Sequence, residues 1–68
     1  MTPIKLKDVK KGDFFTLKPI EEPSNNQVYI KGEYDRSEKK YLCNKWSDYL
    51  GSGRYFKGNK IVYVDFTF

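Results

Sequence analysis

The stretch from Arg54 to Phe68 limits the possible folds most, because runs of aromatic and β-branched residues flank a Gly58-Asn59 pair. Glycine adopts positive φ angles without steric cost and asparagine tolerates them, so this pair predicts the two-residue turn of a β-hairpin. The predicted register pairs Phe56 with Ile61, Lys57 with Lys60, Tyr55 with Val62, and Arg54 with Tyr63.

The second strand of this hairpin is predicted to run to the last residue of the chain. Side chains alternate between the two faces of a strand. One face therefore carries only apolar residues, which we expect to face the core: Val62, Val64, Phe66 and Phe68. A strand this apolar at a chain end is expected to pair within a sheet rather than to fray.

Three further strands are predicted from short alternating runs at residues 14–18, 27–34 and 39–46. Gly32 interrupts the second run, and a glycine inside a strand marks a bulge or a tight bend. Residues 4–9 have the spacing of one helical or 3₁₀ turn, or of a short strand and a turn, and residues 47–53 form a connection. The sequence thus predicts one all-β domain over residues 1–68, either a small five-stranded antiparallel SH3-like barrel or a strongly curled sheet.

The chain is rich in aromatic rings, with five Phe, six Tyr and one Trp among its 68 residues. A domain of this size buries only about 60% of its unfolded surface, and each ring occupies a large area. We therefore expect rings to build the core and the surplus rings to lie at the surface, where together they form a patch.

Residues that support catalysis or metal binding are scarce, since Cys43 is the one cysteine and there is no histidine. A zinc site of the usual ligands cannot be built, and Cys43 lacks a histidine that could activate it, so a buried, inert thiol is expected. Asp13 and Asp65 have the most unusual positions among the acids, but no spacing indicates a catalytic pair. For Asp65, a salt bridge with a nearby Lys or Arg is the simpler interpretation. We expect no enzymatic activity, no cofactor and no disulfide.

The formal net charge of +4 is unevenly distributed, because residues 36–46 sum to +3 whereas residues 19–35 sum to −3. A basic segment can bind polyanions by releasing counterions, and it can equally serve solubility. The chain has no apolar run of the length that a signal peptide or a membrane span of about 20 residues needs. We therefore expect a cytoplasmic protein that does not bind membranes.

Most of the chain is covered by three stretches that match a known group of proteins: KLKDVKKGDFFTLK, VYIKGEYDRSEKKYLC and YFKGNKIVYVDFTF. They resemble small proteins of gut bacteria of the Bacteroides group and of their phages and mobile elements. The opening Lys11-Gly12-Asp13-Phe14 is also similar to the first strand of many SH3-like barrels. The resemblance implies a compact domain from a group of unknown function, and it supplies no catalytic or binding residues.

Basic and aromatic residues are interleaved along the predicted strands. Surfaces that bind nucleic acid use flat rings to stack bases and cations to contact phosphates. We therefore predict that DNA or RNA binds the outer face of the second, third and fourth strands. The predicted stacking residues are Tyr29, Trp46, Tyr55 and Tyr63. The predicted phosphate-binding residues are Lys31, Lys39, Lys40, Lys45, Arg54 and Lys57.

Two other interpretations of the same residues stay open. The rings can build the core of a chain that is poor in Leu and Ile, with lysines around its rim. They can also form an exposed apolar patch for a protein partner or a homodimer, as aromatic grooves of SH3 domains do. In a phage or mobile element, such a domain would be an accessory factor.

Overall fold

The computed structural model describes residues 1–48 and 53–68, which form six β-strands and three short 3₁₀ segments. The strands are β1 (Thr2–Lys5), β2 (Phe14–Thr16), β3 (Val28–Asp35), β4 (Lys40–Lys45), β5 (Arg54–Phe56) and β6 (Ile61–Val64). The 3₁₀ segments are η1 (Leu6–Asp8), η2 (Asn25–Gln27) and η3 (Trp46–Asp48). The predicted connection at 47–53 overlaps η3, and its residues 49–52 lie outside the described residues. Within the described ranges, no helix has the length and apolar character needed to cross a membrane.

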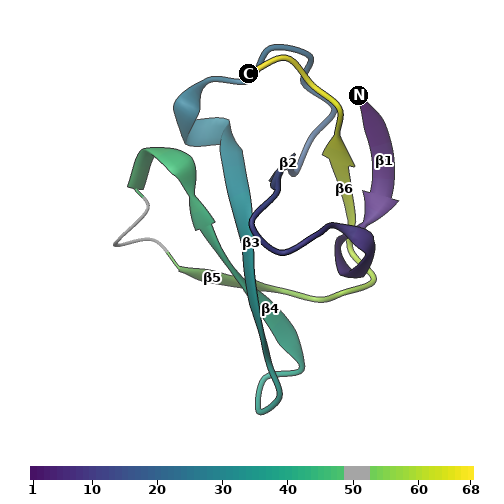
Figure 1. Cartoon of the computed structure of the whole chain (residues 1–68), viewed down its shortest axis with the longest axis vertical. Helices are drawn as coiled ribbons and strands as arrows, with labels where there is room; N and C mark the ends of the chain where they lie inside the picture. The colour runs from purple at the N-terminus through teal and green to yellow at the C-terminus, as the bar shows by residue number, and fades with distance from the viewer. Residues whose placement is uncertain (49–52) are drawn as a thin grey trace.

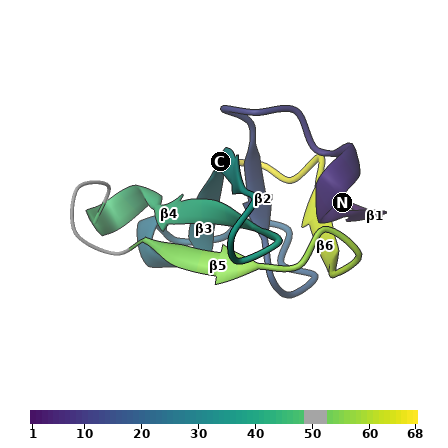
Figure 2. The ribbon, with the colours of Figure 1, turned by 90° about the horizontal axis from the view of Figure 1, so that it is seen from below.

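All six strands belong to one antiparallel sheet with the order β1-β6-β2-β3-β4-β5. The chain from β2 to β5 is a meander, and β6 then returns to lie between β1 and β2 (Figure 1). Figure 2 shows that the sheet is curled, since β4 and β5 run across the view while β2 and β6 stand nearly upright. The all-β prediction is confirmed, with six strands instead of five in an open sheet whose edges are β1 and β5.

Gly32 lies where β3 and β4 change register. The pairing shifts between Lys31 and Tyr34, and a Cβ atom at Gly32 would lie 2.3 Å from the carbonyl oxygen of Leu42. Only a glycine allows the two backbones to approach this closely. The predicted bulge is therefore confirmed, and beyond it the ring of Tyr34 packs edge-on against that of Tyr41, with centroids 5.0 Å apart.

The core lies between the two halves of the curled sheet, and the predicted rings form only part of it beside aliphatic residues. Phe15 stacks on Tyr29 with ring centroids 5.7 Å apart, and Phe56 packs edge-on against both rings. Leu6 enters the core from η1, where the spacing of residues 4–9 predicts a single turn. The buried apolar residues of this cluster are Leu6, Val9, Phe15, Tyr29, Cys43 and Val62.

The predicted Gly58-Asn59 hairpin is wrong, although a turn does occur there. Gly58 and Asn59 are not among the described residues with positive φ, which a two-residue hairpin turn requires. Instead, β5 pairs with β4, while β6 pairs with β1 and β2. The turn is bound to η1, because the amides of Leu6 and Lys7 donate to the carbonyls of Lys60 and Gly58, each over 2.9 Å. It carries the chain from one half of the sheet to the other.

The register expected for this hairpin is wrong as well. Phe56 lies opposite Tyr41, and Ile61 lies opposite Lys5, so these two residues do not face each other. Both partners are distant in the sequence. A local turn signal carries no information about them.

Strand β6 ends at Val64, before the predicted end at residue 68. Asp65 has a φ of 60°, a left-handed conformation that aspartate tolerates better than most residues, and it turns the chain out of the sheet. Of the residues predicted for the core face, Val62 is buried but Phe68 is 50% exposed. The amide of Thr67 donates over 2.9 Å to the carbonyl of Glu21 in the loop after β2, which holds residues 65–68 against this loop.

Candidate interaction surface

Two of the residues predicted to bind nucleic acid are part of the interior. Tyr29 is 4% exposed and Lys31 is 6% exposed, so the expectation that both face solvent is wrong. Alternation correctly places them on one face of β3, but it does not say which face is covered. The face with Tyr29 and Lys31 is the inner one, because Tyr29 belongs to the core cluster together with Phe15 and Cys43, which lie opposite Tyr29 and Lys31 on the neighbouring strands.

Lys31 has a structural role in this position. Its Nζ donates to the backbone carbonyls of Lys7, at 3.3 Å, and of Val9, and it lies 4.2 Å from the centre of the Tyr41 ring. Burial lowers the pKa of the Lys31 ammonium group, and attraction by Cys43 and Asp8 partly opposes this. Lys31 fastens η1 and the residue that follows it, Val9, to β3, and its burial leaves little of the side chain accessible to a phosphate.

Four of the other predicted residues lie in three separate regions. Lys39 lies at the tip of the β3–β4 hairpin, where Tyr55 of β5 donates a 3.3 Å hydrogen bond to the carboxylate of Asp35, whose charge raises the pKa of Tyr55. Trp46 lies beyond the opposite end of β4, and Lys57 lies in the turn beside η1. Among the rest, Arg54 is exposed, and the residues Lys40, Lys45 and Tyr63 are partly buried.

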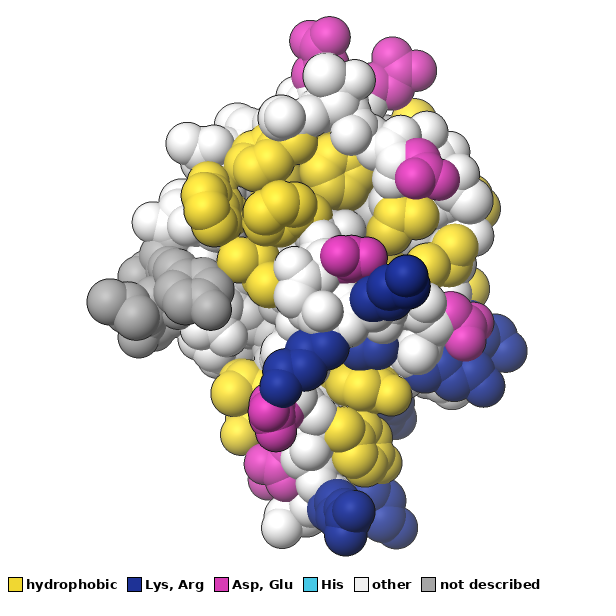
Figure 3. Space-filling view, viewed as in Figure 1, with side chains coloured by type: hydrophobic (Ala, Val, Ile, Leu, Met, Phe, Trp, Pro, Cys, Tyr) yellow, Lys and Arg dark blue, Asp and Glu magenta, His cyan; other side chains and the backbone are white. Residues whose placement is uncertain are grey.

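Surplus rings do lie at the surface, and they include two of the four predicted ones, Trp46 and Tyr55. Phe14, Trp46 and Phe68 are 38%, 45% and 50% exposed. Their ring centroids lie 5.5 Å apart for Phe14 with Trp46 and with Phe68, and 6.3 Å apart for Trp46 with Phe68. Phe66 extends the group through an edge contact with Phe68 at 6.5 Å. We call these four residues the outer ring cluster. Figure 3 shows that hydrophobic side chains gather in the upper part of this face of the molecule.

The cluster is assembled from segments that are distant in the sequence. Phe14 and Phe15 are neighbours on β2 and point to opposite faces, so Phe15 fills the core while Phe14 faces outward. Trp46 follows β4 directly, and Phe68 arrives through the turn at Asp65. The folded sheet is therefore needed to bring the rings together.

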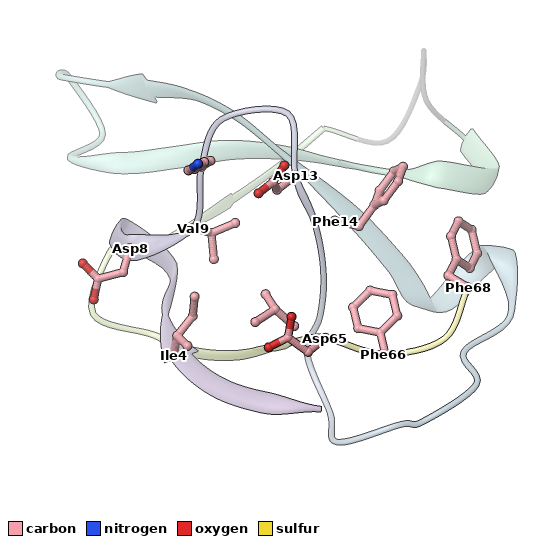
Figure 4. A pocket seen from close by; sticks show the side chains of 10 residues that line it. Ile4, Asp8, Val9, Asp13, Phe14, Asp65, Phe66 and Phe68 are labelled. Atoms are coloured by element: carbon pink, nitrogen blue, oxygen red, sulfur yellow. The ribbon is translucent and has the colours of Figure 1, made fainter.

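A hollow of about 540 Å³ adjoins the cluster and shares three of its rings (Figure 4). Its apolar lining consists of Ile4, Val9, Phe14, Val64, Phe66 and Phe68, and its charged lining consists of Asp8, Lys10, Asp13 and Asp65. Three carboxylates and one ammonium group leave this site with a net charge of −2. We call it the acidic hollow, and its sign is opposite to the net charge of +4 of the whole chain.

The backbone holds two of these acids in place. Asp13 follows Gly12, whose φ is 90°. The Gly12 amide donates to the Lys31 carbonyl over 2.8 Å, and the Lys31 amide donates to the Asp13 carbonyl over 3.1 Å. Asp65 is set by its own left-handed conformation. Within residues 1–48 and 53–68 neither carboxylate forms an ion pair, so the salt bridge considered for Asp65 is not present there.

The described residues offer little support for metal binding or for a reactive cysteine. No group of three or more described His, Cys, Asp or Glu side chains is arranged to hold a metal ion. Cys43 is buried, as the sequence predicts, and burial raises the pKa of its thiol, which disfavours the reactive thiolate.

The sequence contained partial signals for this surface. Asp13 and Asp65 stand out as unusual acids, and alternation within β2 places Phe14 opposite Phe15. A last strand that runs to residue 68 predicts Phe66 and Phe68 on the core face, but β6 ends at Val64 and Asp65 turns the chain out of the sheet. No family model, curated protein or solved structure matches this chain.

Proposed function

We propose that this protein is a small, non-enzymatic interaction module whose outer ring cluster binds an apolar segment of a partner protein. The observation that carries the proposal is the mutual contact of Phe14, Trp46 and Phe68, each more than a third exposed. Interface centres are enriched in aromatic residues, and a few such residues supply most of the binding energy. Rings that pack together and still face water are suited to that role.

We also propose that the curled sheet is a partly open SH3-like barrel. Support comes from the connectivity, because β2 to β5 form a meander and β6 returns beside β2. In this interpretation β1 is an additional strand on the free edge of β6.

The partner in this proposal is a different protein rather than a second copy. A symmetric dimer uses the same patch on both subunits. Two copies joined through the outer ring cluster would place two acidic hollows, each with a net charge of −2, at the same interface. Like charges in an interface are strongly unfavourable, so the charge of the acidic hollow opposes self-association.

Selection of binders from a phage-displayed library of short random peptides tests the proposal. The matched negative selection uses the double variant Phe14→Ser/Phe68→Ser, whose fold is checked by circular dichroism. We expect enriched peptides to bind the wild type, to change the emission of Trp46, which is the single tryptophan, and to lose binding to the variant. No enrichment, or equal binding to the variant, would contradict the proposal. A dimer that the variant abolishes would identify a second copy as the occupant instead.

Nucleic-acid binding keeps one supporting observation, at a different place from the predicted face. The contacts between η1 and the turn at 57–60 bring four exposed lysines onto neighbouring segments: Lys5, Lys7, Lys57 and Lys60. None of them forms an ion pair with a described residue. A salt titration of binding to single-stranded DNA and RNA tests this second candidate, and absence of binding at low salt would eliminate it.

A further inference from the structure

The acidic hollow and the outer ring cluster form one continuous site. Phe14, Phe66 and Phe68 line the hollow and belong to the cluster. A ligand in the hollow therefore contacts rings and carboxylates at the same time. Its volume of about 540 Å³ lies within the range of about 300–1,000 Å³ typical of ligand pockets, which is enough for a few side chains.

The carboxylates are oriented toward this space. Figure 4 shows Asp13 and Asp65 on opposite sides of the opening, with both carboxylates directed into the area between Val9 and Phe66, whereas Asp8 points away. The two inward-pointing acids have no cationic partner among the described residues. Their backbones are held by the contacts of Gly12 with β3 and by the left-handed turn at residue 65. Two unpaired acids on a fixed frame form a site for a cation.

A particular side-chain chemistry satisfies both halves of this site. The guanidinium group of arginine is planar, pairs with carboxylates in a fixed geometry and stacks on aromatic faces. We infer that the bound partner segment presents an arginine, or less favourably a lysine, next to an apolar residue, with the cation between the acids of the hollow and the apolar side chain on the outer ring cluster. This inference rests on the proposed function.

The same arrangement disfavours other ligands. A phosphate or an acidic peptide is repelled by the net charge of −2 of the hollow. A purely apolar peptide can contact the rings, but it leaves both carboxylates without a partner and gains nothing from them. The site should therefore select peptides by charge as well as by hydrophobicity.

The experiment uses a peptide enriched in the selection above, blocked at both ends, and a copy in which citrulline, a neutral analogue, replaces arginine. Affinities are measured by titration of Trp46 emission. Loss of a charge-assisted contact is expected to weaken binding by about tenfold or more. The double variant Asp13→Asn/Asp65→Asn should bind both peptides equally, and asparagine tolerates the left-handed conformation at residue 65.

A control variant, Glu38→Lys, makes the same change of +2 in net charge in the turn between β3 and β4, and should keep the preference for arginine. If the citrulline peptide binds as well as the arginine peptide, or if the Asp13→Asn/Asp65→Asn variant keeps the preference, the inference is wrong. In that case binding that still requires Phe14 and Phe68 leaves the proposed function intact. Binding that requires neither ring contradicts the proposed function itself.

Discussion

Two groups of rings lie on opposite sides of β2, and they differ in their surroundings rather than in their internal geometry. The inner group of Phe15, Tyr29 and Phe56 has ring centroids 5.5–6.4 Å apart, and the outer ring cluster has centroids 5.5–6.5 Å apart. The inner group is covered by both halves of the sheet, whereas the outer cluster faces water beside carboxylates. Ring contacts alone therefore do not separate a structural cluster from an interaction surface, but burial and neighbouring charge do.

The largest effect on stability is expected when the ring of Phe15 is removed, and the matched comparison is removal of the adjacent ring of Phe14. Phe15→Ala removes a fully buried ring and should lower the free energy of unfolding by about 3–5 kcal/mol, which is enough to unfold many domains with a thin stability margin. Phe14→Ala should cost about 1 kcal/mol, because its ring is partly in water already. Chemical denaturation followed by circular dichroism measures both, and similar losses would show that the two rings are equally structural.

The bulge at Gly32 comes next, because it decides which side chains of β3 lie on the inner face. Gly32→Ala places a Cβ 2.3 Å from a backbone oxygen of Leu42, so the backbone must shift, and we expect a loss of about 1–3 kcal/mol. Gly53→Ala is the matched control, since its Cβ would meet only the Leu42 side-chain end, at 3.0 Å. Thermal unfolding of both variants measures the difference. An equal loss in both would mean that the close approach of β3 and β4 is not the constraint.

The sequence could predict the alternation of side chains along each strand, but not which strands pair with each other. The alternation around Phe15 and Val62, the bulge at Gly32 and the turn at residues 4–9 are local features, and all are present. The pairing of β6 with β1 depends on distant residues, so the local turn signal at Gly58 predicts a hairpin between β5 and β6 that the fold does not contain. For the surface, composition predicted exposed rings, but the choice of Tyr29 required knowing which face of β3 is covered.

A smaller effect is expected from Lys31, whose ammonium group lies over the Tyr41 ring beside the core cluster. Burial lowers its pKa from the ordinary value of 10.5, because the charged form of the group is less favourable in the fold than in the unfolded chain. Between the folded-state pKa and 10.5 the unfolded state binds more protons, so stability rises with pH. The difference in unfolding free energy between the wild type and Lys31→Met, measured by chemical denaturation, should therefore shift in favour of the wild type as the pH is raised. A constant or opposite difference would mean that the charge of Lys31 is not penalised in the fold.

The smallest effect on stability is expected at the end of the chain, where the comparison of the two ring groups is sharpest. Phe68→Ala removes an exposed ring that contacts Trp46 and Phe14, so the unfolding temperature should stay nearly unchanged, while Trp46 becomes more hydrated and its emission moves to longer wavelength. Phe56→Ala is the contrasting change in the inner group, and it should lower the unfolding temperature. A marked loss of stability in Phe68→Ala would mean that the outer ring cluster stabilises the fold as the inner group does. A stable protein with red-shifted Trp46 emission supports the view that these rings are held in contact by the fold without contributing much to it, which leaves their exposed area free to bind a partner.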